Sequence, residues 1–261
     1  MVPQIRNNDM IDAILADVEK RISSKADLSW FNLHNRRFKE TLVSLLSEVP
    51  PPAKVVELGA SPGHLTLAMK ALGYDVTGLD LAPDRFIFDM WAEDIKICCA
   101  DLETGSLPFG NSIFDCAVLT EVIEHLEPKS LPLLFSEIYR ILSPNGNLFL
   151  STPNISTLDN RLLRAIGKYS LYEEHKREYA MDEVVMLIKA SAFKITKKWY
   201  SKNRDVVTHF VMDKFISKDH VIIGFFKKPN WKNFGRLITL PIKCLIPSTR
   251  STIFVIAKKI E

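Results

Sequence analysis

The chain has 261 residues, 47% of them hydrophobic, and carries a formal net charge of +3. This length suits one large domain or two small ones, and so high a hydrophobic fraction excludes a globally disordered chain. The charge is too small to indicate a nucleic-acid partner by itself, although eight of the 34 Lys and Arg residues fall within residues 227–261.

Four cysteines are present and none follows C-x-x-C spacing: Cys98, Cys99, Cys116 and Cys244. We expect them to be reduced core cysteines of a cytoplasmic protein. The polar first ten residues do not resemble a signal peptide. No uncharged apolar run approaches the ~18–20 residues needed to span a membrane.

The first 52 residues are predicted to form a helical cap. Residues 8–22 place apolar side chains on one helical face, and a second helix is expected over residues 30–48. Pro50–Pro52 ends that helix and acts as a stiff spacer before a core over residues 53–200. Five side chains of the second helix could line a substrate mouth or pack in the core, and we favour the core: Trp30, Phe31, His34, Arg36 and Arg37.

Residues 54–67, KVVELGASPGHLTL, predict a buried strand, a tight turn of small residues and the start of a helix. In the turn, Gly59, Ser61 and Gly63 stand at every second position. Such a turn lets backbone N–H groups approach a ligand without side chains in the way. It differs from the dinucleotide-binding pattern G-x-G-x-x-G, and an acidic residue, Glu57, precedes its first glycine by two positions.

From residue 54 to about 152, strand and helix patterns alternate, which indicates a parallel sheet covered by helices on both faces. The expected strands lie near residues 54–58, 75–80, 95–99, 114–119 and 147–152. The expected helices lie near residues 63–72, 83–92 and 128–142. Ligands of such sheets bind at the carboxyl ends of the strands, where five polar residues gather: Glu57, Asp80, Asp101, Glu121 and Thr152.

This succession of motifs resembles the class I S-adenosylmethionine-dependent methyltransferases over about residues 55–153, with a weaker likeness as far as residue 193. The first motif of that family has the form E-x-G-x-G-x-G, and Ser61 here replaces the middle glycine. The resemblance implies an α/β fold with a doubly wound, Rossmann-like sheet of seven strands and helices on both faces. It also implies S-adenosylmethionine as the cofactor.

The resemblance also implies which residues contact the cofactor. In that family the residue matching Asp80 binds the ribose, and the residue matching Asp101 meets the adenine amino group. A carboxylate at Asp80 can accept hydrogen bonds from both ribose hydroxyls. The residues expected to contact the cofactor are Glu57, Gly59, Ala60, Ser61, Gly63, Asp80, Leu81, Asp101, Leu102 and Thr120.

Methyl transfer from a sulfonium is an in-line displacement, so the protein must align the acceptor and exclude water. A hydroxyl acceptor must also lose its proton. The side chains that could take this proton are Glu121, Glu124, His125, His175 and Tyr179. We favour His125 because imidazole is the side chain that ordinarily titrates nearest neutral pH, and we keep His175 and Glu121 as further catalytic candidates.

A metal-binding role is a second interpretation of the same residues. Glu121, Glu124 and His125 have the i, i+3, i+4 spacing that shares one face of a helical turn, and with His175 they could hold Mg²⁺ or Mn²⁺. The run is similar to one in ubiquinone-pathway O-methyltransferases and small-RNA 2′-O-methyltransferases, where it is implicated in metal binding. We favour the alternative, in which the glutamates bond backbone groups and the histidine borders the substrate.

After Pro153 the pattern becomes loop-like, with a short helix expected over residues 161–166. A helix over residues 182–192 and a sixth strand over 193–200 follow. Residues 252–257, TIFVIA, predict the last strand, within a final segment 251–261. The family commonly places this strand antiparallel, between the fifth and the sixth, so residues 201–250 are expected to form a helical insertion or lid.

Within that insertion, residues 231–246 combine an apolar helical stripe with Lys232, Arg236 and Lys243 on the opposite side. Such a helix could lie against an anionic membrane, which would make the protein a peripheral one. We favour packing against the sheet or a contact between subunits.

The leading hypothesis is an enzyme that methylates a hydroxyl of a small molecule or a glycan, which could be lipid-linked. The alternative is metal-dependent RNA 2′-O-methylation, which is weakened because no RNA-binding module or broad basic stripe is evident. A hypothesis of another class is a non-catalytic S-adenosylmethionine-binding or interaction protein. The sequence does not identify the acceptor.

Overall fold

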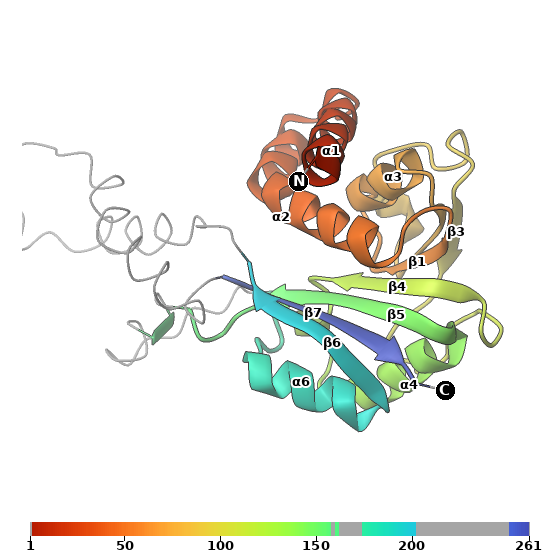
Figure 1. The fold of residues 1–261 in the computed structure, drawn as a ribbon, viewed down its shortest axis with the longest axis vertical. Coiled ribbons are helices and arrows are strands. Elements are labelled where there is room, and N and C mark those ends of the chain that lie inside the picture. The colour runs from red at the N-terminus through yellow and green to blue at the C-terminus, as the bar shows by residue number, and fades with distance from the viewer. Residues whose placement is uncertain (1, 158–159, 162–173, 202–250, 261) are drawn as a thin grey trace, which may run out of the picture.

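The computed structural model describes residues 2–157, 160–161, 174–201 and 251–260. In this part of the chain a single sheet separates two layers of helices (Figure 1). The predicted insertion over residues 201–250 lies outside the described residues apart from Ser201, and so does the amphipathic stretch 231–246. Of the short helix expected over residues 161–166, only Arg161 is described.

The sheet has seven strands in the order β3-β2-β1-β4-β5-β7-β6. Neighbouring strands from β3 to β5 run parallel, and β7 runs antiparallel to both β5 and β6. The predicted fold class is therefore confirmed, including the antiparallel last strand. The strands are β1 Lys54–Leu58, β2 Asp75–Asp80, β3 Lys96–Cys99, β4 Phe114–Thr120, β5 Leu142–Pro153, β6 Phe193–Tyr200 and β7 Thr252–Lys259.

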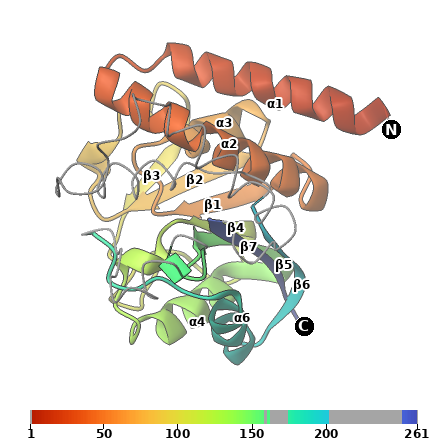
Figure 2. The same ribbon diagram turned by 90° about the vertical axis from the view of Figure 1, so that its left-hand side faces the viewer.

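Helices cover both faces because the central strands are apolar on both sides. One face carries α1 Val2–Lys20, α2 Lys25–Glu48 and α3 His64–Ala71, and the other carries α4 Leu131–Ile141 and α6 Met181–Ala190 (Figure 2). Each face has its own buried apolar cluster. None of the helices in the described part of the chain is long and apolar enough to cross a membrane.

Helix α2 begins five residues earlier than predicted, at Lys25. The cause is a side-chain cap, because the Ser24 hydroxyl accepts hydrogen bonds from the backbone N–H groups of Ala26 and Asp27. The extra turn brings Ala26 and Asp27 onto the same helix as Arg37, and all three line the cavity described below.

The helix predicted over residues 83–92 is wrong. The structure has only a 3₁₀ turn there, Pro83–Arg85, followed by irregular backbone. Phe86, Phe88 and Met90 turn inward while the residues between them are exposed, so burial alternates with a period of two rather than 3.6. The three side chains pack over Gly63, where an added Cβ would lie 2.0 Å from Met90 Cε.

The fifth strand also starts earlier than expected. Residues 142–146, which precede the predicted strand, lie inside β5, where the pairing with β4 shifts register between Phe114 and Cys116 and Asn145 adopts a φ of +65°. This is a bulge that lets the chain pass from α4 into the sheet without a separate loop.

Candidate active site

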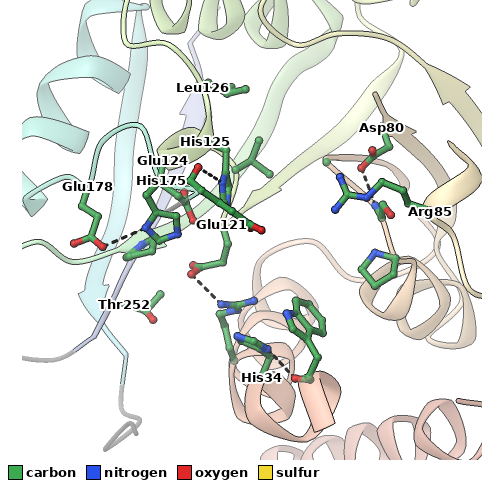
Figure 3. Close-up of a pocket in the computed structure, with 18 of the residues that line it drawn as sticks. His34, Asp80, Arg85, Glu121, Glu124, His125, Leu126, His175, Glu178 and Thr252 are labelled. Atoms are coloured by element: carbon green, nitrogen blue, oxygen red, sulfur yellow. Dashed lines mark hydrogen bonds and ion pairs between the residues drawn. The ribbon is translucent and has the colours of Figure 1, made fainter. Parts of the chain in front are cut away.

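A cavity of about 1330 Å³ opens at the carboxyl ends of the parallel strands. The turns after β1, β2, β3 and β4 line it together with the end of β5 and one face of α2 (Figure 3). Its residues fall into two groups. We call those after β1, β2 and β3 the donor half, and those after β4 and β5, with Arg37 and residues 174–178, the acceptor half.

The turn after β1 is built from glycines that no other residue could replace without strain. Gly59 and Gly63 have φ angles of +77° and +101°, in the left-handed region that side chains disfavour. A Cβ on Gly59 would lie 2.5 Å from Val122 Cγ2. Gly59 and Ser61 line the cavity, whereas Ala60 is buried and, like Gly63, is not among its lining residues.

Two carboxylates of the donor half are anchored by backbone N–H groups. Asp80 accepts from Ser61 N–H at 2.9 Å and from Ala82 N–H at 3.1 Å, which joins the end of β2 to the glycine turn. Asp101 accepts from Glu103 N–H at 2.8 Å. Both line the cavity, as do the predicted contacts Leu81 and Leu102, while Thr120 is not among the lining residues.

Glu57 lies beneath the glycine turn rather than in the cavity lining. It is buried, and the Thr66 hydroxyl donates a 2.5 Å hydrogen bond to its Oε2. Burial, followed by the negative charge of Asp80, raises the pKa of Glu57 to about 8 against the lowering effect of Thr66. This carboxyl therefore retains its proton at neutral pH.

In the acceptor half, Glu121 is held on two sides. The Ser151 hydroxyl donates to Oε1 at 2.8 Å, and Arg37 Nη1 lies 2.9 Å from Oε2. The backbone of Glu121 has a φ of +56°, which is uncommon for a residue other than glycine. Its N–H donates to Ser151 O at 2.9 Å, so the neighbouring strand fixes this conformation.

Glu124 is buried beside Glu121, and only one of its two carboxyl oxygens has a hydrogen-bond partner among the described residues. The Thr152 hydroxyl donates to Oε2 at 2.9 Å, but Oε1 has no hydrogen-bond partner among the described residues. Burial, followed by repulsion from Glu121, holds the pKa of Glu124 well above its ordinary value. Its Oε1 is therefore available to a ligand in the cavity that it lines.

Two histidines meet at the same point. His125 Nδ1 lies 3.0 Å from the Glu174 carbonyl, which can only accept, so Nδ1 carries the proton and Nε2 of the neutral ring has a free lone pair. The rings of His125 and His175 are 4.9 Å apart, edge to face. Glu124, His125 and His175 each offer one ligand atom, and these three atoms lie within 4.8 Å of one another (Figure 3).

Three of the four predicted metal ligands therefore come together, and Glu121 is instead paired with Arg37. The reason is local geometry: residues 123–125 form a single 3₁₀ turn rather than the α-helical turn that the spacing suggested. Tyr179, a further candidate base, is buried and is not among the lining residues.

The contacts that hold His175 beside Glu124 leave no direct sign in the sequence. The backbone N–H groups of Lys176 and Arg177 donate to Glu124 O at 2.8 and 3.2 Å. The ammonium group of Lys176 pairs with Glu103 and Glu127, at 2.9 and 3.2 Å. Segment 174–177 is thereby fixed across the loops that follow β3 and β4.

Glu178 is a site residue that sequence reasoning missed. It is buried, its Oε1 lies 3.2 Å from His175 Nδ1, and its Oε2 accepts from Asn160 Nδ2 at 3.2 Å. A carboxylate in this position orients the imidazole ring. The i, i+3 spacing of a histidine and a glutamate was visible in the sequence, but it is too common to be informative alone.

The interpretation of the second helix was correct for Phe31 and wrong for Trp30, His34 and Arg37. Phe31 is fully buried, whereas the other three line the cavity. Burial, followed by the charge of Arg37, lowers the pKa of His34 to about 4, and its Nδ1 donates to Trp30 O at 2.8 Å. Positions 30, 34 and 37 follow helical spacing, which could have identified this second face.

Comparison with known proteins gives a consistent result. A family model described as a methyltransferase domain matches residues 31–197, more than half of the chain. The chain is 30% identical over 105 residues to a malonyl-[acyl-carrier protein] O-methyltransferase of Erwinia billingiae, covering 40% of the chain and 41% of that protein. It is 30% identical over 114 residues to a ubiquinone biosynthesis O-methyltransferase of Xanthomonas oryzae, covering 39% and 44%. The chain thus spans less than half the length of these curated relatives.

A solved structure also shares the fold. A crystal structure of a SAM dependent methyltransferase from Archaeoglobus fulgidus superposes with a TM-score of 0.59, over 88% of this chain and 99% of that one. The sequences of the two are 16% identical, so this likeness concerns the fold alone.

The raised pKa of Glu57 predicts a pH-dependent stability. Between the ordinary pKa of a glutamate and about 8, the unfolded chain releases a proton that the folded protein keeps. The contribution of Glu57 is therefore full at acidic pH and declines by about 1.4 kcal/mol per pH unit as the pH rises. Glu57→Gln should remove this slope. In urea unfolding, the free energy of unfolding of the variant should therefore rise by about 2–3 kcal/mol relative to that of wild type between pH 5.5 and pH 7.5.

The control is Glu93→Gln, at an exposed carboxylate paired with Arg21 away from the cavity. Its pH dependence should match that of wild type. A difference between Glu57→Gln and wild type that stays constant with pH would contradict the assignment of a protonated Glu57.

Proposed function

The chain belongs to the methyltransferase domain family, and from this premise we propose that it transfers a methyl group from S-adenosylmethionine to a hydroxyl oxygen of a small molecule or a glycan. The observation that carries the proposal is the position of His125. Its Nδ1–H is committed to the Glu174 carbonyl, so Nε2 can accept a proton in the same cavity as the glycine turn and Asp80.

The donor half suits S-adenosylmethionine chemically. The glycine turn would admit the cofactor close to the backbone, Asp80 has lone pairs left for the ribose hydroxyls, and Asp101, which lines the same cavity, would meet the adenine amino group. The cofactor carries a sulfonium and an ammonium cation, and carboxylates around the cavity favour both.

The reaction then needs few protein groups. An acceptor oxygen attacks the methyl carbon, the carbon–sulfur bond breaks and its electron pair stays on sulfur, which gives S-adenosylhomocysteine. The hydroxyl proton passes to His125 Nε2. The positive charge that the sulfonium loses is then carried by the His125 imidazolium. Glu178 and the Lys176 contacts keep the His175 ring beside it, and alignment of donor and acceptor supplies much of the rate.

An oxygen acceptor is also supported by the relatives, since the malonyl-[acyl-carrier protein] and ubiquinone proteins are both named O-methyltransferases. Their names describe those proteins and do not identify the acceptor of this chain. We take from them the kind of atom that is methylated, not the molecule that carries it.

Transfer of a labelled methyl group from S-adenosylmethionine to catechols, quinols, glycosides and short RNAs tests the proposal. We expect transfer to a hydroxyl of the first three classes and a drop in kcat of about 100-fold or more for His125→Asn. S-adenosylmethionine affinity, measured by calorimetry, should be unchanged in this variant. Tight cofactor binding with no transfer to any class would instead support a non-catalytic binding protein.

Asp80→Ala tests the cofactor half separately. Loss of charge-assisted hydrogen bonds to the ribose should weaken S-adenosylmethionine binding by about 2 kcal/mol, or roughly 30-fold. Asp84→Ala, at an exposed carboxylate four residues further on, is the matched control and should bind as wild type does. Equal affinities for the two variants would mean that the adenosine does not bind at the end of β2.

We further propose that a divalent cation such as Mn²⁺ or Mg²⁺ could assist this reaction, held by Glu124, His125 and His175. The observation in favour is that their ligand atoms converge while Glu124 Oε1 has no partner among the described residues. Glu178 at His175 Nδ1 and the Glu174 carbonyl at His125 Nδ1 resemble the outer contacts that orient metal-bound histidines. Such an ion would polarise an acceptor oxygen.

Metal dependence and a simple base role for His125 are mutually exclusive, because both use the same nitrogen, Nε2. If the ion is required, a chelator should abolish methyl transfer, and added Mn²⁺ or Mg²⁺ should restore it. Full activity in excess chelator would remove the metal from the proposal and leave His125 as the base. Cofactor affinity should be insensitive to the chelator in both cases and serves as the control.

A further inference from the structure

We propose that the acceptor half takes an uncharged hydroxyl compound in preference to an anionic one, and that Glu121 sets this preference by neutralising Arg37. The proposal rests on the proposed function, because it assigns a charge to the acceptor of that reaction. It makes Glu121 a specificity-determining residue, where the sequence suggested a catalytic base or a metal ligand.

Arg37 would otherwise be an anion-binding group. A guanidinium is always charged and its planar fork matches carboxylates and phosphates. Of the two arginines among the described lining residues, Arg85 lies beside Asp80 in the donor half, which leaves Arg37 for the acceptor half (Figure 3). Arg37 Nη1 is 2.9 Å from Glu121 Oε2, with 17% and 14% of the two side chains exposed. Solvent therefore screens this pair only weakly.

Glu121, the partner of Arg37, is held by hydrogen bonds to the sheet. Glu121 follows β4 directly, and both its backbone N–H and its Oε1 are bonded to Ser151 of the adjacent strand. Its positive φ is sustained by these contacts. An incoming anion would have to compete for Arg37 with a carboxylate that cannot swing away without breaking the hydrogen bond that the Ser151 hydroxyl donates to its Oε1.

The other carboxylates of the acceptor half, among the residues that the structure describes, are also unfavourable to an anion. Glu178 is buried against His175, and Glu174 lines the same wall. A second carboxylate or a phosphate placed among them would be repelled and poorly hydrated. An uncharged hydroxyl faces no such barrier, and Oε1 of Glu124, which has no partner in the described part of the chain, offers it a hydrogen bond.

The experiment compares acceptors that differ at one group, an uncharged hydroxymethyl or an anionic carboxylate: methyl glucoside against methyl glucuronide, and dihydroxybenzyl alcohol against dihydroxybenzoate, with methylation followed at the ring hydroxyls that both members share. Wild type should prefer the uncharged member of each pair by at least about tenfold in kcat/KM. Glu121→Gln keeps the size of the side chain and frees Arg37, so the preference should fall by about tenfold or more. Adding Arg37→Gln to that variant should remove the gain for the anion.

Glu93→Gln is the matched control, since it breaks another glutamate–arginine pair, with Arg21, away from the cavity. It should leave the preference unchanged. A wild-type enzyme that uses the anionic member equally well, or a Glu121→Gln variant with the wild-type preference, would overturn the proposal.

A binding measurement separates this inference from the proposed function. Benzoate and benzyl alcohol are titrated by NMR into protein loaded with S-adenosylhomocysteine. Benzoate should bind Glu121→Gln at least about fivefold more tightly than wild type, while benzyl alcohol binds both alike. If this holds but no acceptor is methylated, the proposed function fails and the role of Glu121 stands. If methylation occurs without the shift in benzoate affinity, the role of Glu121 fails alone.

Discussion

The close approach of Val122 to Gly59 is the contact on which the site depends. A Cβ on Gly59 would lie 2.5 Å from Val122 Cγ2, so only a glycine lets the loop after β4 pack against the turn after β1. Val122 stands between Glu121 and Glu124, and its position therefore fixes where both carboxyl groups enter the cavity. Gly59 thus has two effects: it leaves room for a cofactor at the turn after β1, and it lets the residues after β4 lie close to that turn.

Around that contact, three glutamates with little exposure to solvent have different partners and different charge states. Glu57 has only a hydroxyl as partner and keeps its proton, whereas Glu121 is paired with a guanidinium. Glu124 lies between these extremes, with Thr152 on one oxygen, the other unmatched among the described residues, and a raised pKa. One residue type thus provides a neutral structural group, a counter-ion and a ligand-facing group, because each position has a different partner.

Much of the sheet and of the donor half followed from the sequence, because local pattern determines them. Apolar runs predicted the strands, and carboxylates at the ends of parallel strands had to converge on one edge. The segment after β2 was predicted to be a helix over residues 83–92, whereas its inward-facing side chains, Phe86, Phe88 and Met90, alternate with exposed ones.

The acceptor half was less predictable, because partners distant in the sequence create it. Lys176 reaches Glu103 across 73 positions, and Arg37 meets Glu121 from a helix that packs on the opposite side of the cavity. Neither pairing leaves a local pattern. Trp30, His34 and Arg37 were assigned to the core together with Phe31, which is interleaved with them and does belong there.

That interleaving has an evolutionary consequence. Helix α2 contributes to stability through Phe31, Phe38 and Leu42 and to the cavity through Trp30, His34 and Arg37, and the two sets share a backbone but point in different directions. Point changes in the second set can alter which molecules enter and leave the strands untouched, although Trp30 and Arg37 also contact the Phe38 ring of the first set. A lineage of such proteins could therefore diversify its chemistry through one helical face while the sheet beneath stays constant.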